Sequence, residues 1–281
     1  MADNQSQRAI YSHRGRGHFF RNGKKTWEPF QDSSLGAVGG AFARLSRYGG
    51  GAELDLHRLK DGSFVVSHEP TCLVRSGYRP LCEVVPEELV SSWKKDRDRP
   101  ILLSQVVMAM QYHQAATSLW ELKEPHVEQG YLSKISRCIL DASLMDRVTV
   151  IGFEPFLPHL KYLAGESIRV GIIAHPGFLV HRASKYLQQG IGTFLTGWTE
   201  GWQKRMFVPY MYLPFLARAV RRLHGMDMRV IAGVVNEHAY MRRLARMGFD
   251  AIVTDKPAIA INHFQLLITA RVSALETATT V

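Results

Sequence analysis

Residues 230–254, VIAGVVNEHAYMRRLARMGFDAIVT, decide the fold because they contain one complete strand–helix–strand unit. The apolar run Val230–Val235 has the length and the β-branched content of a buried strand. The next segment, Glu237–Met247, spaces its apolar residues at helical intervals, and a second short apolar run follows at Ala251–Thr254. Consecutive strands joined by a helix lie parallel in one sheet, so this stretch predicts a parallel α/β fold.

The same alternation recurs along the rest of the chain. The other predicted strands are Ala9–Ser12, Ala52–Leu56, Phe64–Ser67, Leu119–Leu122, Val148–Phe153, Val170–Ala174 and Thr193–Leu195. Amphipathic segments predicted as helices lie between them, for example at Ser34–Tyr48, Glu128–Leu144 and Pro155–Leu163. About eight such units without a flexible linker predict a single (β/α)8 TIM-barrel domain over residues 1–281. The alternative is an open Rossmann-like or flavodoxin-like sheet, but no strand is followed by G-x-G-x-x-G.

Composition narrows the class of protein. A hydrophobic content of 46% over 281 residues is enough for a full core and excludes a mainly disordered chain. Thirty-five Lys and Arg against 25 Asp and Glu give a net charge of +10, which suits an anionic partner. Cys72, Cys82 and Cys138 form no C-x-x-C pair, and the polar first residues lack an apolar signal segment. We therefore expect a cytoplasmic protein without disulfides or a membrane span.

Acidic side chains gather where the predicted strands end, which is the catalytic face of a barrel. Glu53 and Asp55 alternate along one strand and point to the same side, as do Glu121 and Lys123 on another. Carboxylates directed together into a barrel need a positive partner. The oxygen donors Glu53, Asp55 and Glu121 suit one divalent cation, Mg²⁺ or Ca²⁺, better than zinc or copper.

The same strand ends carry two histidines and two further cations. His13 and His68 titrate near neutral pH and can exchange protons with a reacting group. Arg14 and Lys123 have the charge that a phosphate group requires. Each residue alone has a simpler explanation, such as a loop histidine or a surface ion pair. Their occurrence together, at successive strand ends, favours a catalytic site.

These motifs resemble the glycerophosphodiester phosphodiesterase (GDPD) family, and the resemblance covers nearly the whole chain. The matching motifs are His13-Arg14-Gly15 for the family's H-R-G, Glu53-Leu54-Asp55 for its E-x-D, Asp61-Gly62 before His68, and Glu121-Leu122-Lys123 for its E-x-K. The segment 248–255, GFDAIVTD, is similar to the closing strand G-x-D-x-I-x-T-D. The spacing between the E-x-D motif and its following histidine also agrees.

The resemblance implies a metal-dependent phosphoric diester hydrolase in which the substrate's adjacent hydroxyl attacks phosphorus and a cyclic phosphate forms. In such an enzyme the three carboxylates hold the metal, and the two histidines move protons. Arg14 and Lys123 would stabilise charge on the non-bridging oxygens. Which histidine is the base stays open. The alternatives are a phospholipase D-like lyase of the same superfamily and a non-catalytic, polyanion-binding barrel.

The sequence departs from the family where a substrate would be shaped. Gly233 stands where the family has tryptophan, and the predicted active-site loop at 14–33 is long and basic. A second predicted loop, 197–214, carries Trp198 and Trp202, whose rings could pack against sugars. These features predict that a bulkier sugar phosphodiester, such as agrocinopine in opine catabolism, replaces or supplements the glycerophosphodiester substrate. The alternative is that these aromatic residues form a helix-capping core. The expected partner is a small molecule, because the arginines between 218 and 246 have the spacing of solvated helix faces and no RNA-reading motif accompanies them.

Overall fold

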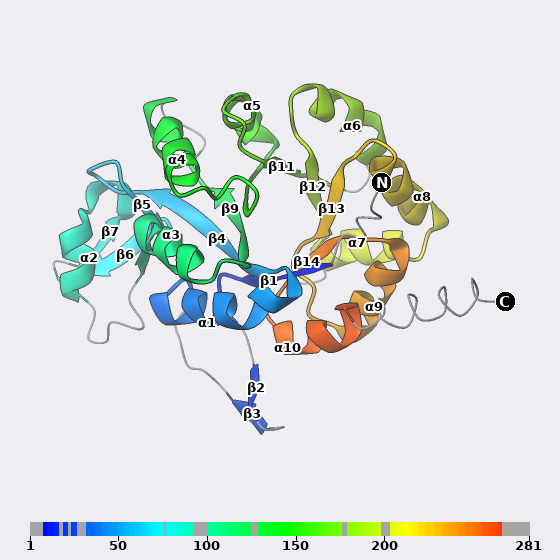
Figure 1. The fold of residues 1–281 in the computed structure, drawn as a ribbon, viewed down its shortest axis with the longest axis horizontal. Helices are drawn as coiled ribbons and strands as arrows, with labels where there is room; N and C mark the ends of the chain where they lie inside the picture. Colours follow the sequence, from blue (N-terminus) through cyan, green and yellow to red (C-terminus); the bar gives the residue numbers. More distant parts are fainter. Residues whose placement is uncertain are drawn as a thin grey trace.

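Eight parallel strands close into a barrel within the part of the chain that the structure describes (Figure 1). The computed structural model describes residues 8–16, 19–21, 24–26, 32–75, 77–92, 100–124, 129–175, 179–197 and 203–265. The barrel strands are β1 (Ala9–His13), β4 (Gly51–Arg58), β9 (Thr117–Leu122), β10 (Val148–Phe153), β11 (Val170–Ile173), β12 (Thr193–Thr196), β13 (Arg229–Ala232) and β14 (Ala251–Thr254). β1 pairs with both β14 and β4, which closes the sheet and confirms the predicted TIM barrel.

Helices surround the strands, as Figure 1 shows. Those that the structure describes are α1 (Leu35–Leu45), α2 (Pro86–Ser92), α3 (Leu103–Tyr112), α4 (Gln129–Asp141), α5 (Leu157–Gly165), α6 (Leu179–Gln188), α7 (Gln203–Met211), α8 (Pro214–His224), α9 (His238–Met247) and α10 (Pro257–Ala260). Ser34 caps α1 by accepting a hydrogen bond from the amide of Ala37, at 3.2 Å. Among the described residues, no helix combines the length and the apolar character that a membrane span requires.

Side-chain alternation along the strands divides the core into two parts. On β1, Ile10 joins the large apolar layer between the strands and the helices. Its neighbours Ala9 and Tyr11 belong instead to a smaller cluster in the barrel interior. His13, at the end of the same strand, continues the inward-facing row. The interior is therefore packed at one end and polar at the carboxyl ends of the strands.

The segment between β4 and α3 differs from the predicted pattern. Phe64–Ser67 was expected to be another strand of the parallel sheet, but β5 (Phe64–Val66) runs antiparallel to β4. The reason is a tight turn at Asp61-Gly62, in which Gly62 has a φ of 79° and Ser63 donates two hydrogen bonds to the Asp61 carboxylate. The chain continues through β6 (Thr71–Val74), β7 (Gly77–Pro80) and α2 to β8 (Ile101–Leu102), which pairs with β5. In Figure 1 this insertion lies beside the barrel.

The two predicted active-site loops are more ordered than we expected. Within residues 14–33, β2 (Phe19–Arg21) and β3 (Lys24–Thr26) form an antiparallel hairpin. Within residues 197–214, helix α7 includes Pro209 and packs Phe207 and Met211 into the core. Phe207 and Tyr210 therefore belong to a helix. Trp198 and Trp202 lie outside the described residues.

Candidate functional site

Three carboxylates meet at the carboxyl ends of neighbouring strands. Asp55 on β4 lies opposite Glu121 on β9, and Glu53 lies two residues earlier on β4, opposite His13 of β1. Each carboxylate offers one oxygen that lies within 4.8 Å of the others. The three residues are buried, with exposures of 4% for Glu53, 2% for Asp55 and 9% for Glu121. The i, i+2 spacing in the sequence and the parallel register of β4 with β9 together produce this cluster.

Two cations contact the acidic cluster. The Nζ atom of Lys123 lies 2.8 Å from Asp55 Oδ1 and donates a hydrogen bond to Glu121 Oε1 at 2.5 Å. The Nε atom of Arg14 lies 3.4 Å from Asp55 Oδ2. Both residues were expected to bind phosphate, and here they pair with the carboxylates, which are the nearest opposite charges. They remain at the edge of the same cavity as the histidines.

The backbone at the end of β1 is shaped to make these contacts. Arg14 has a φ of 54°, in the left-handed region that few non-glycine residues adopt, and its amide donates a hydrogen bond to Glu53 Oε2 at 3.3 Å. Gly15 has a φ of 68°, and a Cβ atom there would lie 2.9 Å from the backbone nitrogen of Val38 in α1. The H-R-G motif therefore requires its glycine, because the turn packs directly against a helix.

With all three carboxylates ionised, the cluster has an excess of negative charge, since three carboxylates face two cations. Burial raises the pKa of Glu53 well above its usual value, and the charges of Asp55 and Glu121 raise it further. Burial also raises the pKa of Glu121, although Lys123 opposes this rise. The same carboxylates raise the pKa of Lys123 in spite of its burial, so the amine stays charged.

The donor set fits a hard divalent cation. All three candidate ligands are carboxylates, and oxygen donors are what Mg²⁺ and Ca²⁺ prefer. The Oδ2 atom of Asp55 is buried and accepts no hydrogen bond from the residues that the structure describes. A cation bound to Glu53, Asp55 and Glu121 would satisfy that atom and compensate the excess charge.

His13 is held by a chain of polar contacts from the last strand. Its Nδ1 atom lies 2.9 Å from Oδ1 of Asp255, which directly follows β14. The other oxygen of Asp255 accepts a hydrogen bond from the side-chain amide of Asn236 at 2.7 Å. Burial alone would raise the pKa of Asp255, but the hydrogen bond and charge of His13, with the bond from Asn236, lower it. An ionised Asp255 can only accept, so Nδ1 of His13 carries the proton and Nε2 is left for chemistry.

The second histidine enters the site from the inserted segment. His68 lies two residues beyond β5, and the amide of Ser67 donates a hydrogen bond to the carbonyl oxygen of Asp55 at 3.0 Å. This bond joins the histidine-bearing segment to the carboxylate strand. The Nδ1 atom of His68 lies 2.9 Å from Oε1 of Glu69, and the side chain is 42% exposed. His68 is therefore the more solvent-accessible of the two histidines.

A cavity of about 400 Å³ brings these groups together and has two unlike halves. One half carries the charged side chains of β1, β4, β9 and the segment after β5. The other half is a largely apolar wall from β10 to β14, formed by Ile151, Phe153, Ile173, Leu195, Gly233, Val234 and Val253. A Cβ atom at Gly233 would lie 2.9 Å from a methyl group of Leu195, so a larger residue there would require the Leu195 side chain to shift.

The structure brings together seven of the predicted site residues, namely His13, Arg14, Glu53, Asp55, His68, Glu121 and Lys123. The predicted sugar-binding residues, Trp198 and Trp202, are not among the described residues. Sequence analysis assigned no role to Asp255 or Asn236. A signal for Asp255 was present, because it follows a predicted strand directly, as His13 does. The residues of the apolar wall could not be recognised from the sequence, because aliphatic residues inside a strand are expected in any buried core.

Comparisons with known proteins identify the fold. No protein-family model and no curated protein sequence matches this chain. Solved structures do match it. A glycerophosphodiester phosphodiesterase from Parabacteroides distasonis is 16% identical, with a TM-score of 0.66, over 95% of this chain and 99% of that one. One from Thermotoga maritima is also 16% identical, with a TM-score of 0.64, over 90% and 95% of the two chains.

A third similar structure contains a ligand. It is a phosphodiesterase from Oleispira antarctica in complex with the product sn-glycerol-3-phosphate, 14% identical with a TM-score of 0.61, and the match covers 91% of this chain and 96% of that one. At such identities the likeness establishes the fold. The resemblance to the GDPD family that the motifs predict is thus confirmed at the level of the barrel.

The Asp255–His13 contact makes stability depend on pH. We expect Asp255→Asn to lower the free energy of unfolding near neutral pH, and we expect the difference from wild type to vanish in acid. A carboxyl whose pKa is lowered by folding stabilises the protein above its unfolded pKa of about 3.9, and this contribution is lost as the pH falls through the folded value. Urea titrations between pH 2.5 and 7 measure the difference, with the exposed Asp227→Asn as control. A difference that stays constant over this range would contradict the assignment.

Proposed function

We propose that this protein is a phosphoric diester hydrolase that cleaves a glycerophosphodiester-like substrate at the mouth of the barrel. One observation carries the proposal: a buried set of three carboxylates shares one cavity with two histidines and two cations. The fold likeness to glycerophosphodiester phosphodiesterases supports it. The structure from Oleispira antarctica, with its bound glycerol phosphate, supports a small phosphate ester as ligand.

The proposed cofactor is one divalent cation, Mg²⁺ or Ca²⁺, held by Glu53, Asp55 and Glu121. When bound, such a cation lowers the pKa of a nearby hydroxyl and neutralises phosphate charge. The chain's own cations act beside it. Once the divalent cation neutralises the charge of the carboxylates, Arg14 and Lys123 would be released to bind the non-bridging oxygens of the phosphate. There they would stabilise the charge that develops in the transition state.

Proton transfer falls to the two histidines. Asp255 orients His13 so that its Nε2 atom can accept or donate a proton at the reacting phosphodiester. Glu69 contacts His68 in a comparable way at the exposed side of the cavity. One histidine would take the proton of the substrate's attacking hydroxyl and the other would protonate the leaving oxygen. The same pair would then hydrolyse the cyclic phosphate intermediate, with a water molecule as the nucleophile.

We further propose a sugar phosphodiester of the agrocinopine type as the substrate. The support is the absence of a large side chain at Gly233, which lines the cavity, together with the aromatic side chains in the sequence after β12. Trp198 and Trp202 would pack against sugar rings. A sugar hydroxyl next to the phosphate would supply the internal nucleophile. Such a substrate would place the enzyme in the catabolism of opines in the cytoplasm.

We expect His13→Ala and His68→Ala each to reduce phosphodiester cleavage by about 10² to 10⁴, because this is the usual contribution of a positioned acid or base. The measurement is release of alcohol and phosphate monoester from glycerophosphocholine, with and without EDTA. His181→Ala, at an exposed position on α6, is the matched control and should keep full activity. Near-normal turnover of both site variants would contradict the proposal. A cyclic phosphate that accumulates as end product would instead identify a phospholipase D-like lyase. Binding of polyanions without turnover would identify a non-catalytic, polyanion-binding barrel.

Metal binding has a readout that does not depend on catalysis. We expect Mg²⁺ or Ca²⁺ to raise the Tm of wild type, because a ligand that binds only the folded state stabilises it. Glu53→Gln should lose most of this rise, since it removes one of three ligands from the site. Glu166→Gln, at an exposed position after α5, should keep it. A cation-dependent rise of equal size in Glu53→Gln and wild type would contradict the ligand assignment.

The substrate proposal predicts a preference that kinetics can measure. We expect kcat/KM for a sugar–phosphate–sugar diester to exceed that for glycerophosphocholine. Trp198→Ala and Trp202→Ala should each lower the value for the sugar diester by about threefold to tenfold, because the stacking of a ring is worth about 0.5–1.5 kcal/mol, and should leave the glycerol compound unchanged. A preference for glycerophosphocholine that neither substitution alters would exclude the sugar diester.

A further inference from the structure

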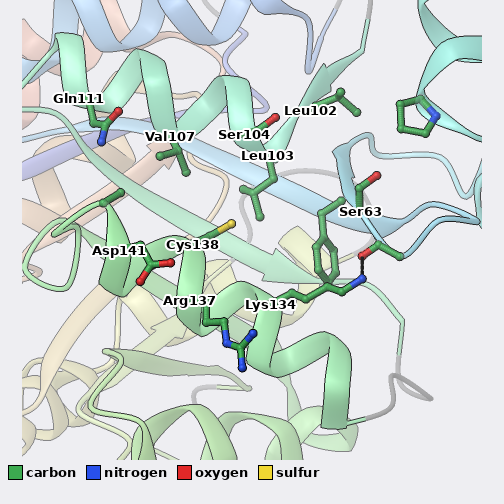
Figure 2. A pocket seen from close by; sticks show the side chains of 14 residues that line it. Ser63, Leu102, Leu103, Ser104, Val107, Gln111, Lys134, Arg137, Cys138 and Asp141 are labelled. Carbon is green, nitrogen blue, oxygen red and sulfur yellow. Dashed lines mark hydrogen bonds between the residues drawn. The ribbon is translucent and has the colours of Figure 1, made fainter.

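A second cavity lies on the outside of the barrel, in a groove between helices α3 and α4. Its volume is about 570 Å³, which is in the usual range for small-molecule sites. Figure 2 shows side chains of α3 and α4 facing each other across it, with Ser63 of the β4–β5 turn at one end. None of its lining residues belongs to the cavity at the barrel mouth. A ligand bound here would not compete directly with a substrate.

The groove runs along the two helices. One side is the row Leu103, Val107 and Gln111 on α3. The other is the row Lys134 and Cys138 on α4, with Ala142 directly after that helix. The first and last members of each row are eight residue steps apart, which at the helical rise corresponds to a length of about 12 Å. Two parallel rows at i, i+4 and i+8 suit an extended chain better than a compact ring system.

The floor of the groove is apolar. Phe64 and Leu103 are buried side chains whose edges reach the cavity, and Leu102 and Val107 are half-buried beside them. The half-buried Cys138 contributes its sulfur from α4, as Figure 2 shows. Covering these side chains with an aliphatic chain would remove apolar surface from water, at about 0.8 kcal/mol for each methylene group buried.

The rim carries an excess of positive charge. Lys134 and Arg137 are exposed on α4, and the only anion that lines the groove among the described residues is Asp141. The Nζ atom of Lys134 donates a hydrogen bond to the carbonyl oxygen of Gly62 at 3.2 Å, which holds the amine at the turn end of the groove. Asp141 lies seven residues further along α4, near the opposite end. An anionic group is therefore attracted to the Lys134 end and repelled from the Asp141 end.

We propose that this groove binds a single-chain anionic amphiphile, such as a medium-chain fatty acid. Its chain would lie between α3 and α4, on Val107 and Cys138. Its head group would pair with Lys134 and Arg137. The length of the groove, its aliphatic floor and its charged end each match one part of such a ligand. The inference does not rest on the proposed hydrolase activity, because the two cavities share no residue.

The test uses decanoate with the full-length protein, and it reads both affinity and location. Isothermal titration calorimetry should show saturable binding of decanoate, with weaker binding of decan-1-ol. Alkylation of Cys138 by iodoacetamide should slow at saturating decanoate, and alkylation of the exposed Cys82 should not change. Because burial raises the pKa of Cys138, its basal reaction is slow and should be followed at high pH by mass spectrometry.

Two sets of variants test the assigned residues. The double variant Lys134→Met, Arg137→Met should weaken decanoate binding about threefold to tenfold, as expected for the loss of two exposed ion pairs. Asp141→Asn should strengthen it, and the matched control Lys185→Met, on α6, should leave it unchanged. If the double variant does not fold, Asp141→Asn and the protection of Cys138 in wild type still decide the matter. Absence of saturable binding, equal binding of decan-1-ol, or binding without protection of Cys138 would each overturn the proposal.

Discussion

The burial of three carboxylates within 4.8 Å of one another is the constraint on which the rest of the site depends. Like charges at this distance, removed from water, raise each other's pKa and destabilise the folded chain unless positive charge is nearby. Lys123 and Arg14 supply part of that charge. Lys123 directly follows β9, which carries Glu121, and Arg14 directly follows β1, which pairs with β4. The two cations thus compensate the three carboxylates only in part, and a divalent cation would supply the remaining positive charge.

The barrel provides the geometry that this arrangement needs. Parallel strands end at the same face, so short motifs far apart in the sequence place their side chains in one cavity. The apolar wall from β10 to β14 forms the other side of that cavity. A low dielectric on one side strengthens the electrostatic interactions on the other. In the function that we propose, the charged half would bind the phosphate and the apolar half would pack against the remainder of the substrate.

Particular elements show how far sequence reasoning reached. The strands at Val148–Phe153 and Ala251–Thr254 were predicted with the observed bounds, because buried parallel strands are continuous apolar runs. The strand beginning at Phe64 was also found, but its direction was wrong. Its composition is that of a buried strand in either orientation, and only the turn at Gly62 reverses it. Helix α7 was missed because its pattern is interrupted by Pro209 and crowded with aromatic residues.

By itself the sequence determined the parallel barrel, the pairs of residues that share a strand face, and the set of charged residues at the strand ends. These properties follow from local periodicity, which is set by backbone geometry and can be read from a few neighbouring residues. The tertiary structure decided the contact of His13 with Asp255 across 242 residues of sequence, the pairing of Lys123 and Arg14 with the carboxylates, and the groove between α3 and α4. Each of these depends on how the closed sheet and its helices pack, and no local pattern encodes the distance between side chains brought together by closure.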